Sequence, residues 1–260
     1  MILKLDDVRQ MNSVRELFAV LGLDGQGLIV CPEERAPIVF DYKISPYLLL
    51  SQAASDLHSG GGSALLNSIT NSWRAILCQT DRVLGALGLS NHAKSTKTKA
   101  ELLAFLGLPA PNILRKIGDC RNDLEHRHIP PPLDKVEDAH DIAMLFINAV
   151  DRHLDAFLDT FSLGREDEQL GRCFRRELQF RYDHDSHTFE IFAARHSKDE
   201  CYIGEVLGGI ALTNESPIYK HCARLAFIEV SSVPSDQAID DFFAAVCSAQ
   251  PAVAGAKNRP

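Results

Sequence analysis

The stretch Asn112–His128 reads NILRKIGDCRNDLEHRH and is followed, after Ile129, by the proline block Pro130-Pro131-Pro132. Proline lacks the backbone N–H that a helix interior needs, and it disfavours helical geometry at the preceding residue. We therefore predict one helix that ends near His128. With about 3.6 residues per turn, its apolar residues fall on one face. That face consists of Ile113, Ile117, Cys120 and Leu124.

The opposite face of this predicted helix carries polar groups. Asn122 and His126 are four residues apart and share that face with Arg115 and Asp119, while Arg121 flanks it. A histidine in the last helical turn lies near exposed carbonyl groups, which favour its cationic form. Because histidine gains and loses a proton near neutral pH, it suits acid–base catalysis, and arginine can hold a phosphate through two N–H donors. These groups could cleave RNA through its own 2′-hydroxyl without a metal, although the same residue types are common on solvent-facing helices.

Further helices are predicted on both sides of this stretch, because apolar residues recur there every three or four positions. They cover residues 47–57, 65–87, 98–106 and 134–157. The sequence Thr98-Lys-Ala-Glu101 has the pattern of a capping box, and Asp134 that of an N-cap. The glycine run at 60–62 lacks the preceding strand and following Gly-Lys-Ser/Thr of a phosphate loop, so we expect a helix connector.

The rest of the chain favours strands. Short apolar runs at 27–31 and 38–42 follow a short helical stretch at 8–21. Residues 177–182 and 188–192 alternate between apolar and polar around the turn Asp183–His187, which predicts a hairpin. Further strands are expected at 203–212 and 225–230, and a terminal helix at 240–246. We predict an α+β fold with three regions: a mixed segment 1–45, a helical bundle 46–160, and a small antiparallel β-rich region 161–250.

The motif Arg121-Asn122-Asp123-Leu124-Glu125-His126, followed by a proline-rich break and another long helix, resembles the signature of the HEPN superfamily. That signature is an arginine, a directly following polar residue that is often asparagine, and a histidine a few positions further on. The family's fold is a helical bundle with the motif on a late helix, which matches the helices predicted over residues 46–160.

The resemblance implies a metal-independent endoribonuclease that leaves a 2′,3′-cyclic phosphate and uses no cofactor. Arg121 and Asn122 would hold the phosphate and the 2′-hydroxyl, and His126 would transfer the proton. The resemblance also implies a homodimer through the motif-bearing helix, whose two motifs meet across a cleft. Many such domains are toxins or antiviral defence effectors, so an antitoxin or regulatory protein is a further expected partner.

The charge distribution is consistent with RNA as the substrate. The net charge of −8 argues against wholesale coating of DNA, because phosphate contacts need Lys and Arg. However, basic residues outnumber acidic ones between residues 91 and 128, and the opposite holds from 134 to 168. We therefore assign substrate binding to the basic residues beside the motif. These are Arg115, Lys116, Arg127 and His128.

Two alternatives remain open from the sequence. One is a non-catalytic HEPN-like binding or regulatory module, and the other is a ligand sensor that acts through the β-rich region. A metal site is not expected, because His126 and His128 point to different helix faces and Glu137-x-x-His140 is not duplicated. The cluster Asp183–His187 is explained more simply by an Asx-rich turn. With no apolar run long enough to cross a membrane and no signal peptide, we expect a cytoplasmic protein.

Overall fold

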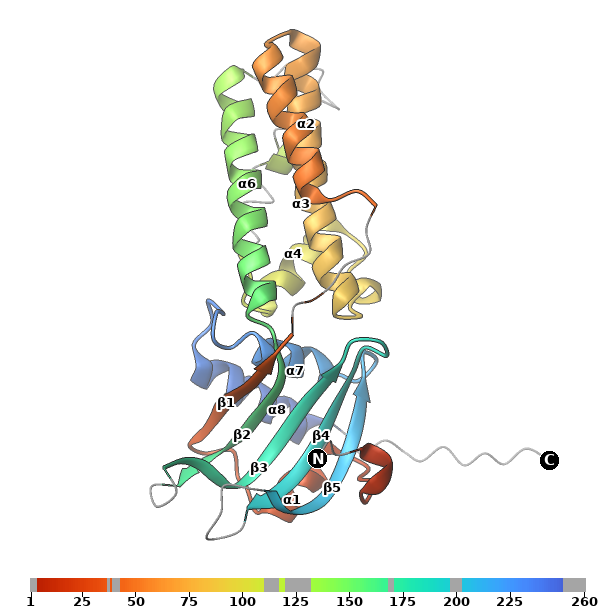
Figure 1. The fold of residues 1–260 in the computed structure, drawn as a ribbon, viewed down its shortest axis with the longest axis vertical. Coiled ribbons are helices and arrows are strands. Elements are labelled where there is room, and N and C mark those ends of the chain that lie inside the picture. The colour runs from red at the N-terminus through yellow and green to blue at the C-terminus, as the bar shows by residue number, and fades with distance from the viewer. Residues whose placement is uncertain are drawn as a thin grey trace, which may run out of the picture. The chain divides into compact units, whose positions relative to one another are not determined.

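The computed structural model describes residues 4–36, 38, 43–109, 117–119, 132–167, 171–196 and 203–249. The chain forms two compact units, which are described separately (Figure 1). The sheet unit comprises Met1–Ala36, Leu158–Glu229 and Val233–Pro260. The helical unit comprises Pro37–Phe157 together with Val230–Ser232. The fold is therefore a mixed α+β structure, as the sequence predicted.

The sheet unit is built on a five-stranded sheet with the order β1-β2-β3-β4-β5, in which all neighbours are antiparallel. The strands are β1 (Leu28–Arg35), β2 (Leu158–Asp167), β3 (Gly171–Asp183), β4 (Thr188–His196) and β5 (Ile203–Thr213). Arg35 at the end of β1 pairs with Leu158 at the start of β2. The helical unit is thus an insertion between two neighbouring strands.

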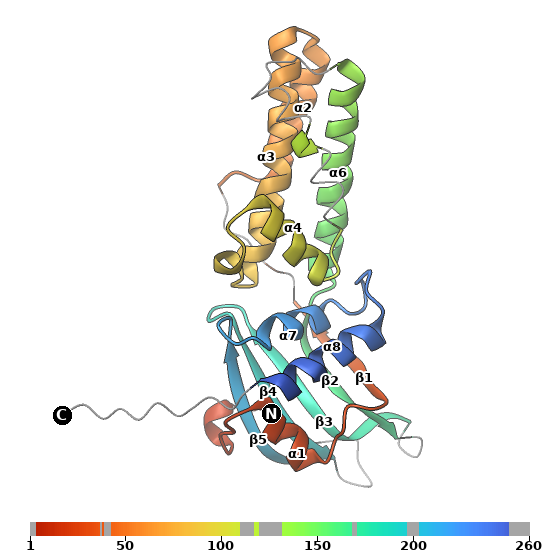
Figure 2. The ribbon, with the colours of Figure 1, turned by 180° about the vertical axis from the view of Figure 1, so that it is seen from behind.

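Three helices cover one face of the sheet (Figure 2). They are α1 (Val14–Leu21), α7 (Tyr219–Ala226) and α8 (Ser235–Ser248). Phe161 of β2 and Phe180 of β3 stack there with ring centroids 4.6 Å apart, and Phe242 of α8 meets Phe180 edge-on at 5.7 Å. Because side chains alternate along a strand, the residues directly before and after Phe161 and Phe180 point to the opposite face.

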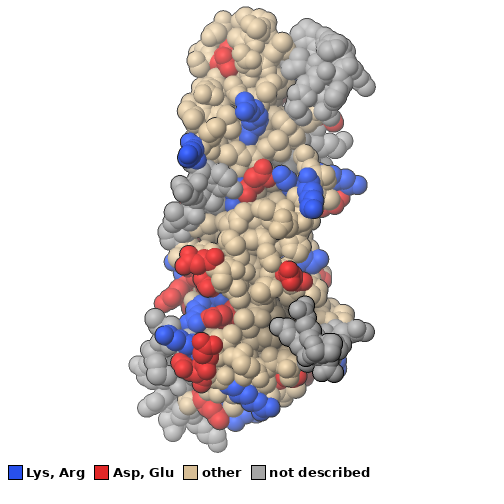
Figure 3. All heavy atoms as spheres, turned by 90° about the vertical axis from the view of Figure 1, so that its right-hand side faces the viewer, with Lys and Arg blue, Asp and Glu red and all other residues tan. Residues whose placement is uncertain are grey.

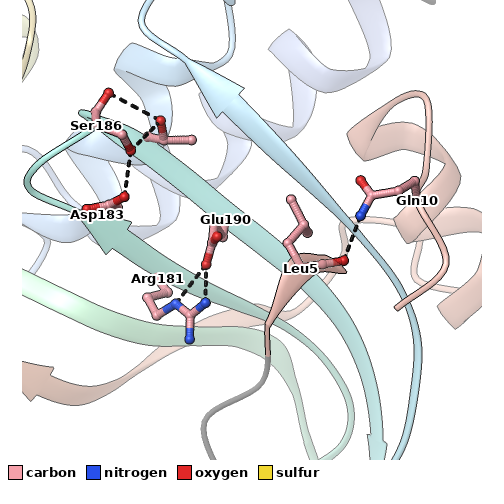
Figure 4. Close-up of polar contacts among 7 residues, drawn as sticks. Leu5, Gln10, Arg181, Asp183, Ser186 and Glu190 are labelled. Atoms are coloured by element: carbon pink, nitrogen blue, oxygen red, sulfur yellow. Dashed lines mark hydrogen bonds and ion pairs between the residues drawn. The ribbon is translucent and has the colours of Figure 1, made fainter. Parts of the chain in front are cut away.

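The hairpin between β3 and β4 forms where the alternation predicted it. In its turn, Asp183 accepts a hydrogen bond from the backbone N of Asp185 at 3.0 Å. It also accepts one from the Ser186 hydroxyl at 2.6 Å (Figure 4). These bonds confirm the Asx-rich turn. The strand predicted at 225–230 is wrong, because α7 extends to Ala226 and residues 227–230 form turns. A short run of buried apolar residues does not distinguish helix from strand.

The helical unit contains α2 (Pro46–Ser59), α3 (Gly62–Ala86), α4 (Thr96–Phe105) and α6 (Leu133–Asp155). Helices α2, α3 and α6 pack against one another (Figure 1). Gly60 ends α2 with a φ of 70°, and Gly60 and Gly61 form the connector to α3, which begins at Gly62. The capping box lies one turn earlier than predicted, because Ser95 and Thr98 exchange hydrogen bonds of 3.1 and 3.2 Å.

Among the described residues, no helix combines the length and the apolar character that crossing a membrane requires. On the face drawn in Figure 3, the described Lys and Arg side chains lie among Asp and Glu rather than forming a patch of one sign.

Candidate functional site

Residues 117–119 are the described part of the helix predicted over 112–128, and they are helical. Ile117 has 1% of its surface exposed, whereas Asp119 is exposed to solvent. A Cβ atom placed on Gly118 would lie 3.4 Å from Cη2 of Trp73 on α3. The predicted apolar and polar faces are therefore confirmed at Ile117 and Asp119.

The motif residues themselves lie outside the described residues. This holds for the three predicted catalytic residues and for the four predicted substrate-binding residues. They are Arg121, Asn122 and His126, and Arg115, Lys116, Arg127 and His128. Their assignment stays a prediction from the sequence and the resemblance.

A polar network joins α2, α3 and α6 within the helical unit. The carboxylate of Asp151 on α6 accepts hydrogen bonds from Tyr47 of α2 at 2.5 Å and from Gln79 of α3 at 2.6 Å. Gln79 is fully buried, and its side-chain oxygen accepts from Arg82 at 2.9 Å. Burial and the bond to Asp151 raise the pKa of Tyr47 to about 12. Because a buried polar group is costly unless it is paired, the bond from Gln79 to Asp151 favours one arrangement of α3 and α6.

The described residues contain no group of three or more His, Cys, Asp or Glu side chains arranged to hold a metal ion. Both carboxylate oxygens of Asp183 are engaged in the hairpin turn. His184 in the same turn contacts Asp159 at 2.7 Å, and that hydrogen bond raises the pKa of His184. Asp183, Ser186 and His184 of the Asp183–His187 cluster are therefore engaged in the turn or in the pair with Asp159.

A second group of polar residues lies in the sheet unit, and sequence reasoning missed it. We call it the polar row. It crosses the sheet from β1 to β4 and consists of Glu33, Ser162, Glu177, Gln179 and His196. Ser162 pairs with Gln179 directly beside the Phe161–Phe180 pair, so the row lies on the face opposite α1, α7 and α8.

Hydrogen bonds and an ion pair join neighbours in the polar row. Glu33 accepts from the Ser162 hydroxyl and, at 3.3 Å, from Gln179. Nε2 of His196 lies 2.9 Å from a carboxylate oxygen of Glu177, and both side chains are more than nine-tenths buried. The period-two pattern places Glu177 and Gln179 on one face, but it does not reveal which residues of β1, β2 and β4 lie beside them.

The electrostatics of the polar row are dominated by burial. Desolvation raises the pKa of Glu177, nearby Glu33 raises it further, and His196 and Ser162 oppose the shift. Nδ1 of His196 is buried and has no hydrogen-bond partner among the described residues. Next to the row, Arg181 pairs with Glu190 on the same face (Figure 4), and its guanidinium lies 5.5 Å from the ring centre of Phe192.

Comparisons with known proteins found no match, whether to a protein family, to a curated protein or to a solved structure.

Proposed function

We propose that the chain is a metal-independent endoribonuclease of the HEPN type, with its active site on the helical unit. The observation that carries the proposal is which side chains of residues 117–119 are buried and which are exposed. Ile117 is buried, and Asp119 is exposed to solvent. Positions three and seven residues beyond Asp119 share its face on a continuous helix, and these positions are Asn122 and His126.

The proposed chemistry needs only groups of the chain and of the RNA. The 2′-oxygen attacks the adjacent phosphorus, the bond from phosphorus to the 5′-oxygen breaks, and a 2′,3′-cyclic phosphate and a 5′-hydroxyl result. His126 takes the proton of the 2′-hydroxyl, and a second histidine donates a proton to the leaving 5′-oxygen. In a homodimer whose motifs meet, the second histidine is His126 of the other copy. Arg121 offsets the charge that develops on the phosphate.

The framework of the helical unit supports this proposal. Helices α2, α3 and α6 are tied together by the hydrogen bonds of Asp151, and Trp73 of α3 lies next to Gly118. Catalytic groups on packed helices are held more accurately than groups on loops. We therefore expect the motif to act as a preformed site.

The test is incubation of the purified protein with a mixture of RNAs in EDTA. The proposal expects fragments with a 2′,3′-cyclic phosphate at one end and a 5′-hydroxyl at the other. RNA with 2′-deoxy substitution at the cleavage position should resist, because the attacking oxygen is missing. Binding of RNA without any cleavage would favour the non-catalytic module, and fragments ending in 5′-phosphate would contradict the proposed chemistry.

A second candidate function, recognition of a small polar ligand by the sheet unit, is favoured by the polar row. The observation that favours it is that Nδ1 of His196 is buried and has no hydrogen-bond partner among the described residues. A ligand that satisfies this atom would raise the melting temperature, because it binds the folded state alone. A small-molecule thermal-shift screen on wild type and His196→Phe tests this. Compounds that stabilise both proteins equally count against the polar row.

A further inference from the structure

Among the described strands, β1 forms one edge of the sheet and β5 forms the other. An exposed strand edge can pair with another chain, and proteins protect such edges with proline, charged side chains or bulges. β1 has all three, because it contains Pro32, three charged residues and two shifts in its register. β5 is longer, has no proline and carries a single charged residue, Glu205. Its own sequence therefore gives the β5 edge little protection.

A segment near the N-terminus crosses the edge of β5. It consists of residues Leu5–Met11, and we call it the N-terminal strap. The backbone N–H of Gly209 in β5 donates to the carbonyl oxygen of Arg9 at 2.9 Å, and its carbonyl oxygen accepts from the N–H of Met11 at 2.8 Å. These two bonds form a parallel bridge around Gln10. The strap thus occupies the outward-facing backbone groups of Gly209.

The N-terminal strap passes from one face of the sheet to the other. A Cβ atom built on Gly209 would lie 2.8 Å from Leu5 and 3.1 Å from Phe192. Phe192 pairs with Gln179 of the polar row, so Leu5 lies on the face that carries this row. Helix α1, which follows the strap, covers the opposite face (Figure 2). Gln10 donates to the carbonyl oxygen of Leu5 at 2.6 Å and ties the two ends of the crossing together (Figure 4).

Two glycines of β5 make room for the N-terminal strap. Glycine inside a strand weakens it and often marks a place where another backbone approaches closely. A Cβ atom on Gly208 would lie 2.9 Å from the carbonyl oxygen of Arg9 and 2.5 Å from the side chain of Met11. On Gly209 it would lie 3.2 Å from Val8. A side chain at either glycine would therefore displace the strap.

Without the strap, the edge of β5 is suited to pairing with a second copy of itself. Gly209 directs its N–H and C=O away from β4, and Ala211, two residues further on, directs its own to the same side. Two β5 strands can therefore pair antiparallel about Gly209, each glycine bonding to the other. In this register Glu205 lies opposite Thr213, so no like charges meet.

We propose that the N-terminal strap is an autoinhibitory contact: it occupies the edge of β5 and thereby prevents this strand from pairing with β5 of a second copy. Release of the strap opens the edge to that partner. The inference concerns the sheet unit alone and does not depend on RNA cleavage by the helical unit.

The test is deletion of residues 2–12, which removes the strap and keeps Ser13, the N-cap of α1. Light scattering at equal concentrations should give a mass at least about twofold above that of wild type. Adding Ala211→Pro to the deletion should restore the wild-type mass. Proline removes the outward-facing N–H at this position, while the backbone groups that bond to β4 lie on the neighbouring residues.

Gly208→Val makes the same test in a chain of full length, because its side chain would collide with Arg9 and Met11. Gly61→Val is the matched control, since a Cβ atom on Gly61 meets nothing within 4 Å. We expect Gly208→Val to raise the mass and to speed hydrogen exchange at the amide of Met11. Gly61→Val should change neither quantity.

Circular dichroism and thermal melting establish which variants are folded. A folded deletion variant with the mass of wild type would overturn the proposal. Association that persists after Ala211→Pro would also overturn it, because another surface would then be responsible. If the deletion variant does not fold, a wild-type mass for Gly208→Val with fast exchange at Met11 would overturn the proposal in the same way.

Discussion

Trp73 and Glu177 are both buried, but burial has opposite consequences for these two residues. For the indole, removal from water is favourable and makes a rigid support for the segment at Gly118. For the carboxylate, it is costly, and it raises the pKa of Glu177. Helical spacing predicted that Ile117 is buried and Asp119 exposed. The sequence contained no sign that Glu177 of β3 and His196 of β4 lie next to each other.

At Glu177, the raised pKa predicts a pH-dependent stability. A carboxyl group whose pKa is higher in the folded state stabilises the fold below its ordinary pKa, and this contribution is lost as pH rises through the folded value. We therefore expect the free energy of unfolding of Glu177→Gln, relative to wild type, to increase from about pH 4 to about pH 7. Urea unfolding at several pH values measures it. A difference that does not vary with pH would show that Glu177 has an ordinary pKa.

At His184, the hydrogen bond to Asp159 raises the pKa of the imidazole, so the charged imidazole stabilises the folded state. The stabilisation is fully present below the unfolded pKa of about 6.5 and is lost as pH rises through the folded value. His184→Gln should therefore lower stability more at about pH 5.5 than at about pH 8.5. His92→Gln, made at an exposed histidine, serves as the control substitution. Equal losses from His184→Gln at both pH values would contradict the pair.

At the scale of elements, periodicity predicted α2, α3, α4, α6 and the β3–β4 hairpin, because each buries one regular face. The sequence did not predict β2, which ends in the charged residues Arg165, Glu166 and Asp167. Strand pairing with β1 and β3 overrides that local signal. The proline block and the apolar spacing predicted a helix over 112–128; its residues 117–119 are helical, and the others lie outside the described residues.

The start of α4 gives a direct test of local chemistry. Ser95→Ala removes the side-chain acceptor for the backbone N of Thr98 and should lower the free energy of unfolding by about 1 kcal/mol. Ser95→Asp retains an N-cap acceptor and should keep most of the stability. Thermal or urea unfolding compares the two variants. If Ser95→Ala left the free energy of unfolding unchanged and Glu101→Ala lowered it, the capping box predicted at Thr98–Glu101 would be supported instead.

At the scale of the whole molecule, the chain leaves the sheet unit at the end of β1 and returns to it at the start of β2. Arg35 and Leu158 are paired, so both connections to the helical unit leave from one end of the same strand pair. No local pattern could predict this arrangement, because β1 and β2 are separated by the complete helical insertion. The sheet unit should therefore fold without the insertion.

This expectation is tested by replacing residues 36–157 with Asn-Gly. A two-residue Asn-Gly turn favours a hairpin and would join the paired residues Arg35 and Leu158 directly. The shortened protein should be monomeric, give a β-sheet circular dichroism spectrum and melt cooperatively. An unfolded or aggregated product would show that the sheet unit depends on the helical unit for its stability.

Dimerisation also belongs to this scale. The proposed mechanism needs a second histidine, which a two-fold axis beside the motif would supply from the other copy. Light scattering at micromolar concentration should give twice the chain mass of 28.7 kDa. A strictly monomeric protein that still cleaves RNA would rule out the shared cleft.

The central claim, catalysis by the motif helix, is tested most directly by RNA cleavage in EDTA with wild type, His126→Ala and His58→Ala. His58 is an exposed histidine at the end of α2 and serves as the matched control. Because His126 is proposed to transfer a proton, its removal should lower cleavage by about a hundredfold or more, while His58→Ala cleaves like wild type. All three proteins should melt at similar temperatures. Full cleavage by a folded His126→Ala protein would contradict the claim.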